Sequence, residues 1–146
     1  AVSQINYYHG DFGRTWCVGE PPKELQERIR LTSIAREVAH DIVGPGMKYS
    51  ELRNTVTAAV KKASATGWTM GGGPHTVGLQ HTDQAYRDGL PFVVGDDHTF
   101  QENMTLTIDL PQGEIGWGAT HLEDLIVITK DGYEPLATMS EPLVVL

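Results

Sequence analysis

Two long amphipathic stretches, separated by Gly44-Pro45-Gly46, constrain the fold of this chain most. In residues 23 to about 43, apolar side chains recur at helical spacing, and Pro22 stands near the first turn, where a missing N–H costs little. The second stretch runs from Ser50, which can cap a helix, to Gly67, which ends it. The sequence therefore predicts two successive helices, each with an apolar face to be covered by another layer.

Segments with β-sheet character flank the two helices. Residues 1–19 are rich in β-formers around His9-Gly10, which predicts two short strands joined by a turn. Residues 104–110 alternate as a strand, residues 111–118 are predicted to turn, and residues 121–129 form a further strand. The order of strands, two helices and strands predicts an α+β fold, with both helices on one face of a sheet.

Composition excludes several classes of partner. The chain has 146 residues, 40% of them hydrophobic, which suits one compact domain over residues 1–146. A net charge of −8 with only 11 Lys and Arg provides no basic surface for nucleic acid or a membrane. No apolar stretch is long enough to cross a bilayer, and the single cysteine, Cys17, cannot form an internal disulfide. We expect a cytoplasmic protein, and the initial Ala1 suggests a trimmed chain.

Three residues stand where a divalent metal ion could bind. His75 follows Gly71-Gly72-Gly73-Pro74, whose glycines allow close approach of backbone and substrate. Asp109 lies within one apolar strand and Glu123 at the start of the next, where a carboxylate requires a partner. An imidazole with hard carboxylate oxygens suits an ion that activates water. Taken singly, His75 could also be a loop residue, and the two acids could face solvent on alternating strands.

Five segments of the chain carry a family resemblance. They read GDFGRTWCVG (10–19), VGPGMKYSEL (43–52), PHTVGL (74–79), MTLTIDL (104–110) and GWGATHLED (116–124). In this order they resemble segments of the creatinase/prolidase/methionine-aminopeptidase superfamily of "pita-bread" proteins. The resemblance covers nearly the whole chain. It implies a curved antiparallel sheet flanked by helices, here with an incomplete first strand.

The resemblance also implies a dinuclear metal site. Asp11 and Glu123 would bridge two ions, which could be Mn, Co, Zn or Fe, while His75 and Asp109 would bind one of them. His81 resembles a histidine that steadies the substrate or its tetrahedral intermediate, with an ordinary loop histidine as the alternative.

The resemblance implies a longer parent protein. The family's first aspartate would lie at or just before Ala1, so this chain is expected to be the C-terminal part of that parent, with an incomplete set of ligands. Two other positions depart from the family pattern. Asp109 stands where Glu is usual, and its carboxylate reaches one methylene less far. His121 replaces the usual Arg two residues before Glu123, which removes a permanent cation and five donors.

The remaining histidines and the polar segment have ordinary interpretations. His9 is assigned to a turn, His40 to a helix surface and His98 to a solvated position. Residues 82–103 are polar and rich in Gly and Asp, which predicts a loop.

Three functions are compatible with these features. The resemblance implies a metal-dependent hydrolase of the Xaa-Pro dipeptidase or creatinase type, acting as a homodimer on a dipeptide or another small molecule. A second hypothesis is a metal-dependent lyase similar to the dimethylsulfoniopropionate lyases of the superfamily, in which Asp83 would be the base that starts β-elimination. The third is a non-catalytic pita-bread domain that binds peptides or partner proteins.

Overall fold

The computed structural model describes residues 2–68, 70, 73–82, 86–87, 90–91 and 98–146. Its elements are β1 (Val2–Ile5), β2 (Tyr8–Asp11), β3 (Thr15–Cys17), α1 (Lys23–Ile42), α2 (Tyr49–Ala63), β4 (His75–Thr76), β5 (Tyr86–Arg87), β6 (Leu90–Pro91), β7 (Thr105–Glu114), β8 (Gly118–Ile128), β9 (Tyr133–Pro135) and β10 (Leu143–Val145). Asp83 lies outside the described residues.

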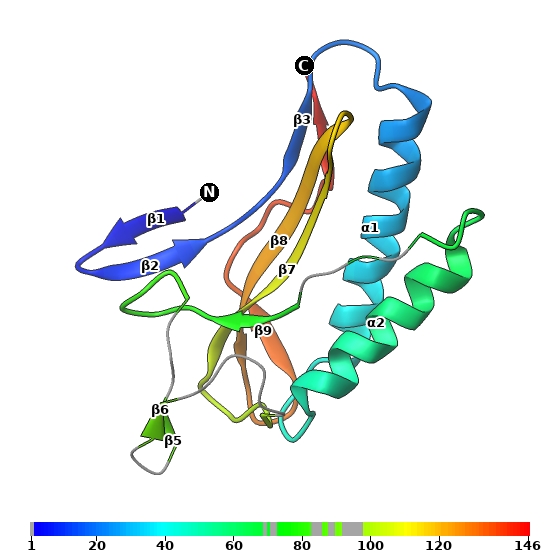
Figure 1. The fold of residues 1–146 in the computed structure, drawn as a ribbon. Helices are drawn as coiled ribbons and strands as arrows, with labels where there is room; N and C mark the ends of the chain where they lie inside the picture. Colours follow the sequence, from blue (N-terminus) through cyan, green and yellow to red (C-terminus); the bar gives the residue numbers. More distant parts are fainter. Residues whose placement is uncertain (1, 69, 71–72, 83–85, 88–89, 92–97) are drawn as a thin grey trace.

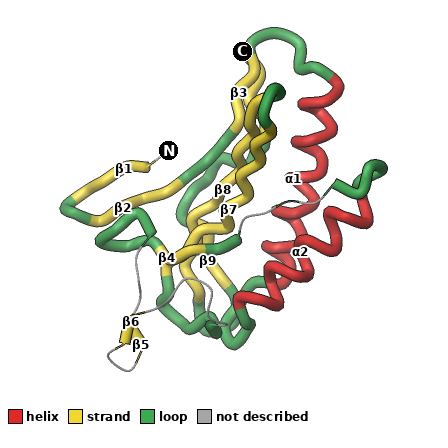
Figure 2. The backbone as a smooth tube through the Cα atoms, in the orientation of Figure 1, coloured by secondary structure: helices red, strands yellow, loops and turns green. Residues whose placement is uncertain are grey.

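An antiparallel sheet in the order β4-β7-β8-β9 forms the central layer. Helices α1 and α2 lie on the same face of this sheet (Figures 1 and 2). The core fills the space between the two layers. Its buried members include Leu31, Ala35, Ala39, Leu52, Val56 and Val60 from the helices and Leu106, Ile108, Leu110, Leu122 and Ile126 from the strands. The predicted α+β fold, with both helices on one face, is confirmed.

Strands β7 and β8 pair along almost their whole length, with Asp109 directly opposite Glu123. Successive side chains of a strand point to opposite faces of the sheet. Ile108 and Leu122 belong to the core beneath the helices, so Asp109 and Glu123 point to the other face. Asp124, the next residue along β8, points back to the helix side. The two consecutive acids of β8 therefore lie in different environments.

A buried cluster of charges around Asp124 ties the N-terminal segment and α1 to β8. Asp124 Oδ1 accepts a 2.5 Å hydrogen bond from Arg14. Asp124 Oδ2 accepts a hydrogen bond from Arg36 and lies 2.8 Å from His40 Nε2. Arg14 also donates to the main-chain oxygen of Glu123 at 2.8 Å. Burial alone would raise the pKa of Asp124, but its three basic partners hold that pKa far below its usual value.

The first hairpin turns at Asn6 and Tyr7, and the prediction of a turn at His9-Gly10 was wrong. Asn6 (φ 50°) and Tyr7 (φ 70°) both adopt the left-handed conformation that a two-residue hairpin turn of this kind requires. His9 lies in β2, where its N–H donates to the oxygen of Gly78 at 2.8 Å. Strand β3, which pairs with β10 in parallel, adds a third strand to the two predicted here.

The hairpin of β7 and β8 is longer than predicted, because its turn occupies only residues 115–117. Pro111, assigned to the turn, is inside β7 and opposite His121. The N–H of His121 donates to Thr15 Oγ1 at 2.9 Å and not to β7. Pro111 therefore occupies a pair without ladder hydrogen bonds, where its missing N–H costs the sheet nothing.

Helix α1 matches its prediction to within one residue at each end. Helix α2 begins at Tyr49, so Ser50 lies inside the helix and is not its cap, and it ends at Ala63, before Gly67. The prediction that His40 lies on a helix surface was wrong. His40 follows Arg36 by one helical turn, so both side chains reach Asp124.

The predicted loop 82–103 contains the short antiparallel pair β5–β6. His98, predicted to be solvated, is half-buried. Its main-chain oxygen accepts a 2.8 Å hydrogen bond from the N–H of Tyr49 at the start of α2. Within the part of the chain that the structure describes, no helix is long and apolar enough to span a bilayer.

Replacing Asp124 by Asn should destabilise the protein strongly. The change removes the carboxylate shared by three basic groups and leaves the Arg14 side chain, which is 1% exposed, without its ion-pair partner. Breaking a buried pair in this way lowers the free energy of unfolding by about 3 to 5 kcal/mol. This decrease can be measured by urea unfolding of the full-length protein, monitored by circular dichroism.

The pH dependence of unfolding should report the same cluster. The pKa of Asp124 is lower in the native state than its ordinary value of 3.8. Its carboxylate therefore contributes to the free energy of unfolding above pH 3.8, and this contribution is lost as the pH falls below that value. Glu27→Gln is the control, since this acid pairs with Arg30 in an exposed i,i+3 bridge. Equal urea midpoints for Asp124→Asn and Glu27→Gln would contradict a stabilising role for the cluster.

Candidate metal centre

The sheet face opposite to the helices carries three of the predicted ligands. Asp109 and Glu123 are cross-strand neighbours on β7 and β8. His75 on β4 pairs with Thr107, two residues before Asp109, and so lies beside it on the same face. His75 Nε2 is 3.6 Å from Glu123 Oε1 and 3.9 Å from Asp109 Oδ2. The Glu123 side chain is buried, while those of Asp109 and His75 are partly accessible.

Asp11 reaches the same place from the end of β2. Two residues further on, Gly13 forms a β-bridge with Glu123, with N–H to O distances of 3.2 and 2.9 Å in the two directions. A Cβ added to Gly13 would lie 3.0 Å from Glu123 Cβ and 3.2 Å from the His121 ring, so this approach requires glycine. Asp11 Oδ2 consequently lies 3.9 Å from His75 Nε2.

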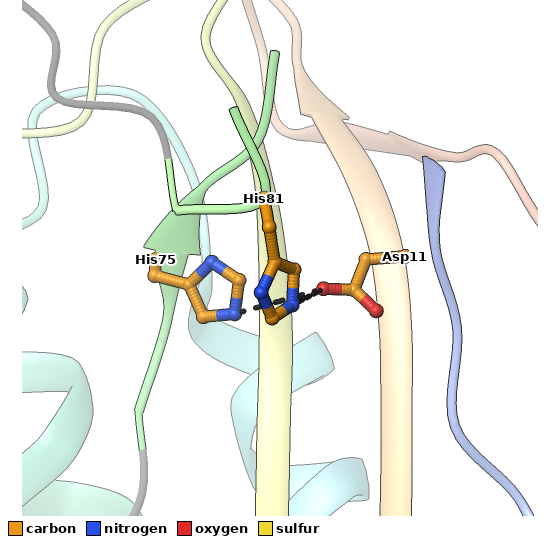
Figure 3. A group of neighbouring side chains, drawn as sticks. All are labelled: Asp11, His75 and His81. Carbon is orange, nitrogen blue, oxygen red and sulfur yellow. Dashed lines mark ion pairs between the residues drawn. The ribbon is translucent and has the colours of Figure 1, made fainter. Parts of the chain in front are cut away.

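His81 completes a second group around Asp11. It lies in the bend after β4, and its Nε2 is 2.7 Å from Asp11 Oδ2 (Figure 3). The Asp11 side chain is 2% exposed, yet its Oδ2 makes no hydrogen bond with any residue that the structure describes. The short contact with His81 therefore lacks hydrogen-bond geometry. Nε2 atoms of two imidazoles, those of His75 and His81, approach one buried carboxylate oxygen.

His121 extends the group on the side of Asp109. Its Nε2 lies 2.7 Å from Asp109 Oδ1, as a hydrogen bond, and 3.5 Å from Glu123 Oε2. The hydrogen bond to Asp109 raises the pKa of His121, with burial opposing and the charges of both acids assisting. The sequence indicated the loss of an arginine at this position but not this contact with Asp109.

The carboxylates of Glu123 and Asp109 also affect the pKa of His75. Burial alone would lower the pKa of His75, but its interactions with Glu123, the Thr76 carbonyl and Asp109 outweigh burial and leave the pKa raised. A proton and a metal ion therefore compete for this imidazole.

The donors fit a divalent metal ion. Atoms bound to one ion through bonds of about 2.1 Å lie roughly 3 to 4.2 Å apart, and the distances of 3.6 and 3.9 Å from His75 Nε2 to the carboxylates fall in this range. His75 belongs to two candidate groups, one with Asp109 and Glu123 and one with Asp11 and His81. The four predicted ligands and His81 thus come together, whereas Asp83 cannot be placed among the described residues.

Gly13→Ala should weaken metal binding. The added methyl group would press on Glu123 and His121, and displacing groups that hold a ligand in place typically costs 10- to 100-fold in affinity. Isothermal titration of the full-length protein with Mn²⁺ measures this loss. Gly113→Ala is the matched control, because a Cβ at Gly113 meets nothing within 4 Å. Equal affinities of the two variants would show that the close approach of Gly13 does not matter.

Metal affinity should fall as the pH is lowered. The pKa of His75 is raised above 6.5, so below its new value the imidazole holds a proton that the ion must displace. We expect a loss of about tenfold per pH unit for one displaced proton. Competition with a chromophoric chelator between pH 8 and pH 5.5 measures it. An affinity that stays constant over this interval would contradict ligation by His75.

Residues 1–130 match Metallopeptidase family M24. The Xaa-Pro dipeptidase of Lactobacillus delbrueckii subsp. lactis is 28% identical over 140 residues, which are 95% of this chain and 36% of that protein. The Xaa-Pro dipeptidase of Pyrococcus furiosus is 26% identical over 139 residues, 94% of this chain and 38% of that protein. The chain thus spans less than two fifths of the length of these two relatives.

Solved structures show the same fold. The X-Pro aminopeptidase of Thermotoga maritima matches with a TM-score of 0.84 at 22% identity, over 99% of this chain and 40% of that one. The prolidase of Pyrococcus furiosus matches with a TM-score of 0.81 at 24% identity, over 96% of this chain and 40% of that one. The predicted pita-bread fold is confirmed. Because the family match covers most of its length, the chain belongs to metallopeptidase family M24.

Proposed function

We propose that the protein is a metal-dependent dipeptidase of the Xaa-Pro type, with Asp11, His75, Asp109 and Glu123 as metal ligands. The observation that carries this proposal is the convergence of three carboxylates and an imidazole from β2, β4, β7 and β8 on one face of the sheet. Two of these carboxylates, those of Asp11 and Glu123, are buried. Buried negative charges require compensation, which a divalent ion provides.

A bound divalent ion would lower the pKa of a water molecule and polarise the carbonyl group of a peptide bond. Asp11 and Glu123, the two buried acids, would hold two such ions together with His75 and Asp109. Three carboxylates balance only part of the charge of two divalent ions. The remaining positive charge would make the site favourable for the negative charge that develops on the substrate.

Neighbouring residues would keep these ligands in place. His121 holds Oδ1 of Asp109 by a 2.7 Å hydrogen bond, which leaves Oδ2 on the side of His75. Partners of this kind fix the orientation of metal-binding carboxylates. This hydrogen bond would keep the shorter side chain of Asp109 in a single orientation. In the role that the sequence predicts for His81, stabilising charge on the substrate, its Nε2 would first have to leave Asp11.

No observation on the described residues favours the two other functions. The lyase hypothesis depends on Asp83, which lies outside them. The hypothesis of a non-catalytic binding domain does not explain why the carboxylates of Asp11, Asp109 and Glu123 lie together. Among the described residues, none of the three has a lysine or arginine partner. A homodimer and a cytoplasmic location stay predictions.

The full-length protein, loaded with Mn²⁺ or Co²⁺, should release proline from Xaa-Pro dipeptides. Glu123→Gln removes a buried ligand and should lower the rate by more than about 100-fold. Glu114→Gln should leave the rate unchanged, because this acid lies at the exposed end of β7 and pairs with Arg28. Acrylate release from dimethylsulfoniopropionate, measured in parallel, tests the lyase. Metal binding without hydrolysis of any Xaa-Pro dipeptide would contradict the proposal.

A further inference from the structure

We propose that Thr15, at the start of β3, is a positioning residue for the candidate metal centre. Its hydroxyl group fixes the main chain of β8 at His121, and the His121 imidazole in turn orients the Asp109 carboxylate. The inference rests on the proposed function, since it takes Asp109 to be a metal ligand. It extends that proposal by assigning a part in metal binding to a side chain that acts only through another residue.

The hydroxyl group of Thr15 binds both main-chain groups of His121. The N–H of His121 donates to Thr15 Oγ1 at 2.9 Å, and Oγ1 donates to the main-chain oxygen of His121 at 3.2 Å. A threonine hydroxyl has one proton to donate and lone pairs that accept, so a single group can make both bonds. In this way the side chain of Thr15 pairs with β8 as a neighbouring strand would.

The main chain of Thr15 is engaged elsewhere. Gly13 and Glu123 form an antiparallel bridge with hydrogen bonds in both directions. In an antiparallel pair, the next hydrogen-bonded partners lie two residues further along each strand, which here are Thr15 and His121. The main chain of Thr15 pairs instead in parallel with Leu143 of β10. The hydroxyl of Thr15 therefore takes the place of its main chain as the partner of His121.

Strand β7 does not hold the main chain of His121 from the other side. The N–H and C=O of one residue in an antiparallel strand point to the same neighbour. Those of Glu123 point to Gly13, so those of His121, two residues earlier, also point away from β7. The residue opposite His121 on β7 is Pro111, which has no N–H to donate. The position of His121 thus depends on Thr15.

The position of His121 matters because its imidazole holds Asp109. His121 Nε2 lies 2.7 Å from Asp109 Oδ1, although the residue directly opposite Asp109 is Glu123. Diagonal neighbours of this kind are about 7 to 8 Å apart at the main chain, so only long side chains in the right position meet. The His121 side chain is 44% exposed, so a few contacts determine where it lies. Without the Thr15 hydroxyl, the hold on Asp109 loosens.

The test is titration of the full-length protein with Mn²⁺, without substrate. Thr15→Val keeps the shape of the side chain but removes the hydroxyl, and we expect it to lower the Mn²⁺ affinity by about 10-fold, as loss of a group that orients a ligand does. Thr15→Ser keeps the hydroxyl and should restore most of this affinity. The matched control is Thr55→Val, on the exposed surface of α2, which should bind Mn²⁺ as the unmodified protein does.

A double-mutant cycle separates positioning from a general loss of stability. If Thr15 acts through His121, Thr15→Val should have little further effect on Mn²⁺ affinity in a protein that carries His121→Ala. An equal loss with and without the imidazole would overturn the proposal. Unchanged affinity of Thr15→Val would also overturn it and would leave the proposed dipeptidase intact, whereas failure of the unmodified protein to bind Mn²⁺ would overturn both.

Amide hydrogen exchange provides a measurement that needs no substitution. In the unmodified, metal-free protein, the N–H of His121 should exchange slowly, because it is bonded to Thr15 Oγ1. Rapid exchange of this amide, with slow exchange of the neighbouring Glu123 amide that is bonded to Gly13, would overturn the role of Thr15.

Discussion

The candidate metal centre depends on how a short N-terminal segment is attached to β8. Gly13 exchanges main-chain hydrogen bonds with Glu123, and Arg14 reaches both the Asp124 carboxylate and the main-chain oxygen of Glu123. These bonds bring Asp11 against β8 although β2 is not a member of the four-stranded sheet. They help to bring together the carboxylates of Asp11 and Glu123, which are more than a hundred residues apart in the sequence.

The alternation of side chains along β8 places its two consecutive acids, Glu123 and Asp124, in different surroundings. Asp124 points toward the helices, and Arg14, Arg36 and His40 neutralise it and keep its pKa low. Glu123 points to the other face, where its ion-pair contacts among the described residues are with histidines. A buried acid with arginine partners has its counter-charge already. A buried acid that has no arginine or lysine partner among the described residues retains its capacity to bind a cation.

Much of this arrangement could be predicted from local sequence. The helices and the core of the long hairpin follow from periodicity, and the four ligands stand in segments that resemble a family. The features that local sequence could not predict depend on tertiary contacts. The contact of His40 with Asp124 joins α1 to β8, and the helix pattern alone does not reveal it. Pro111 is tolerated in β7 because its pair with His121 has no ladder hydrogen bonds, as the bond from the His121 N–H to Thr15 shows. Only the folded register reveals this.

Binding of a metal ion among Asp11, His75 and Glu123 can be observed by anomalous X-ray diffraction. Crystals of the full-length protein grown with Mn²⁺ would be measured above and below the Mn absorption edge. We expect an anomalous peak in contact with these three residues. Crystals without a peak at this position, in which the carboxylates of Asp11 and Glu123 are bonded to protein groups or water, would contradict metal binding there.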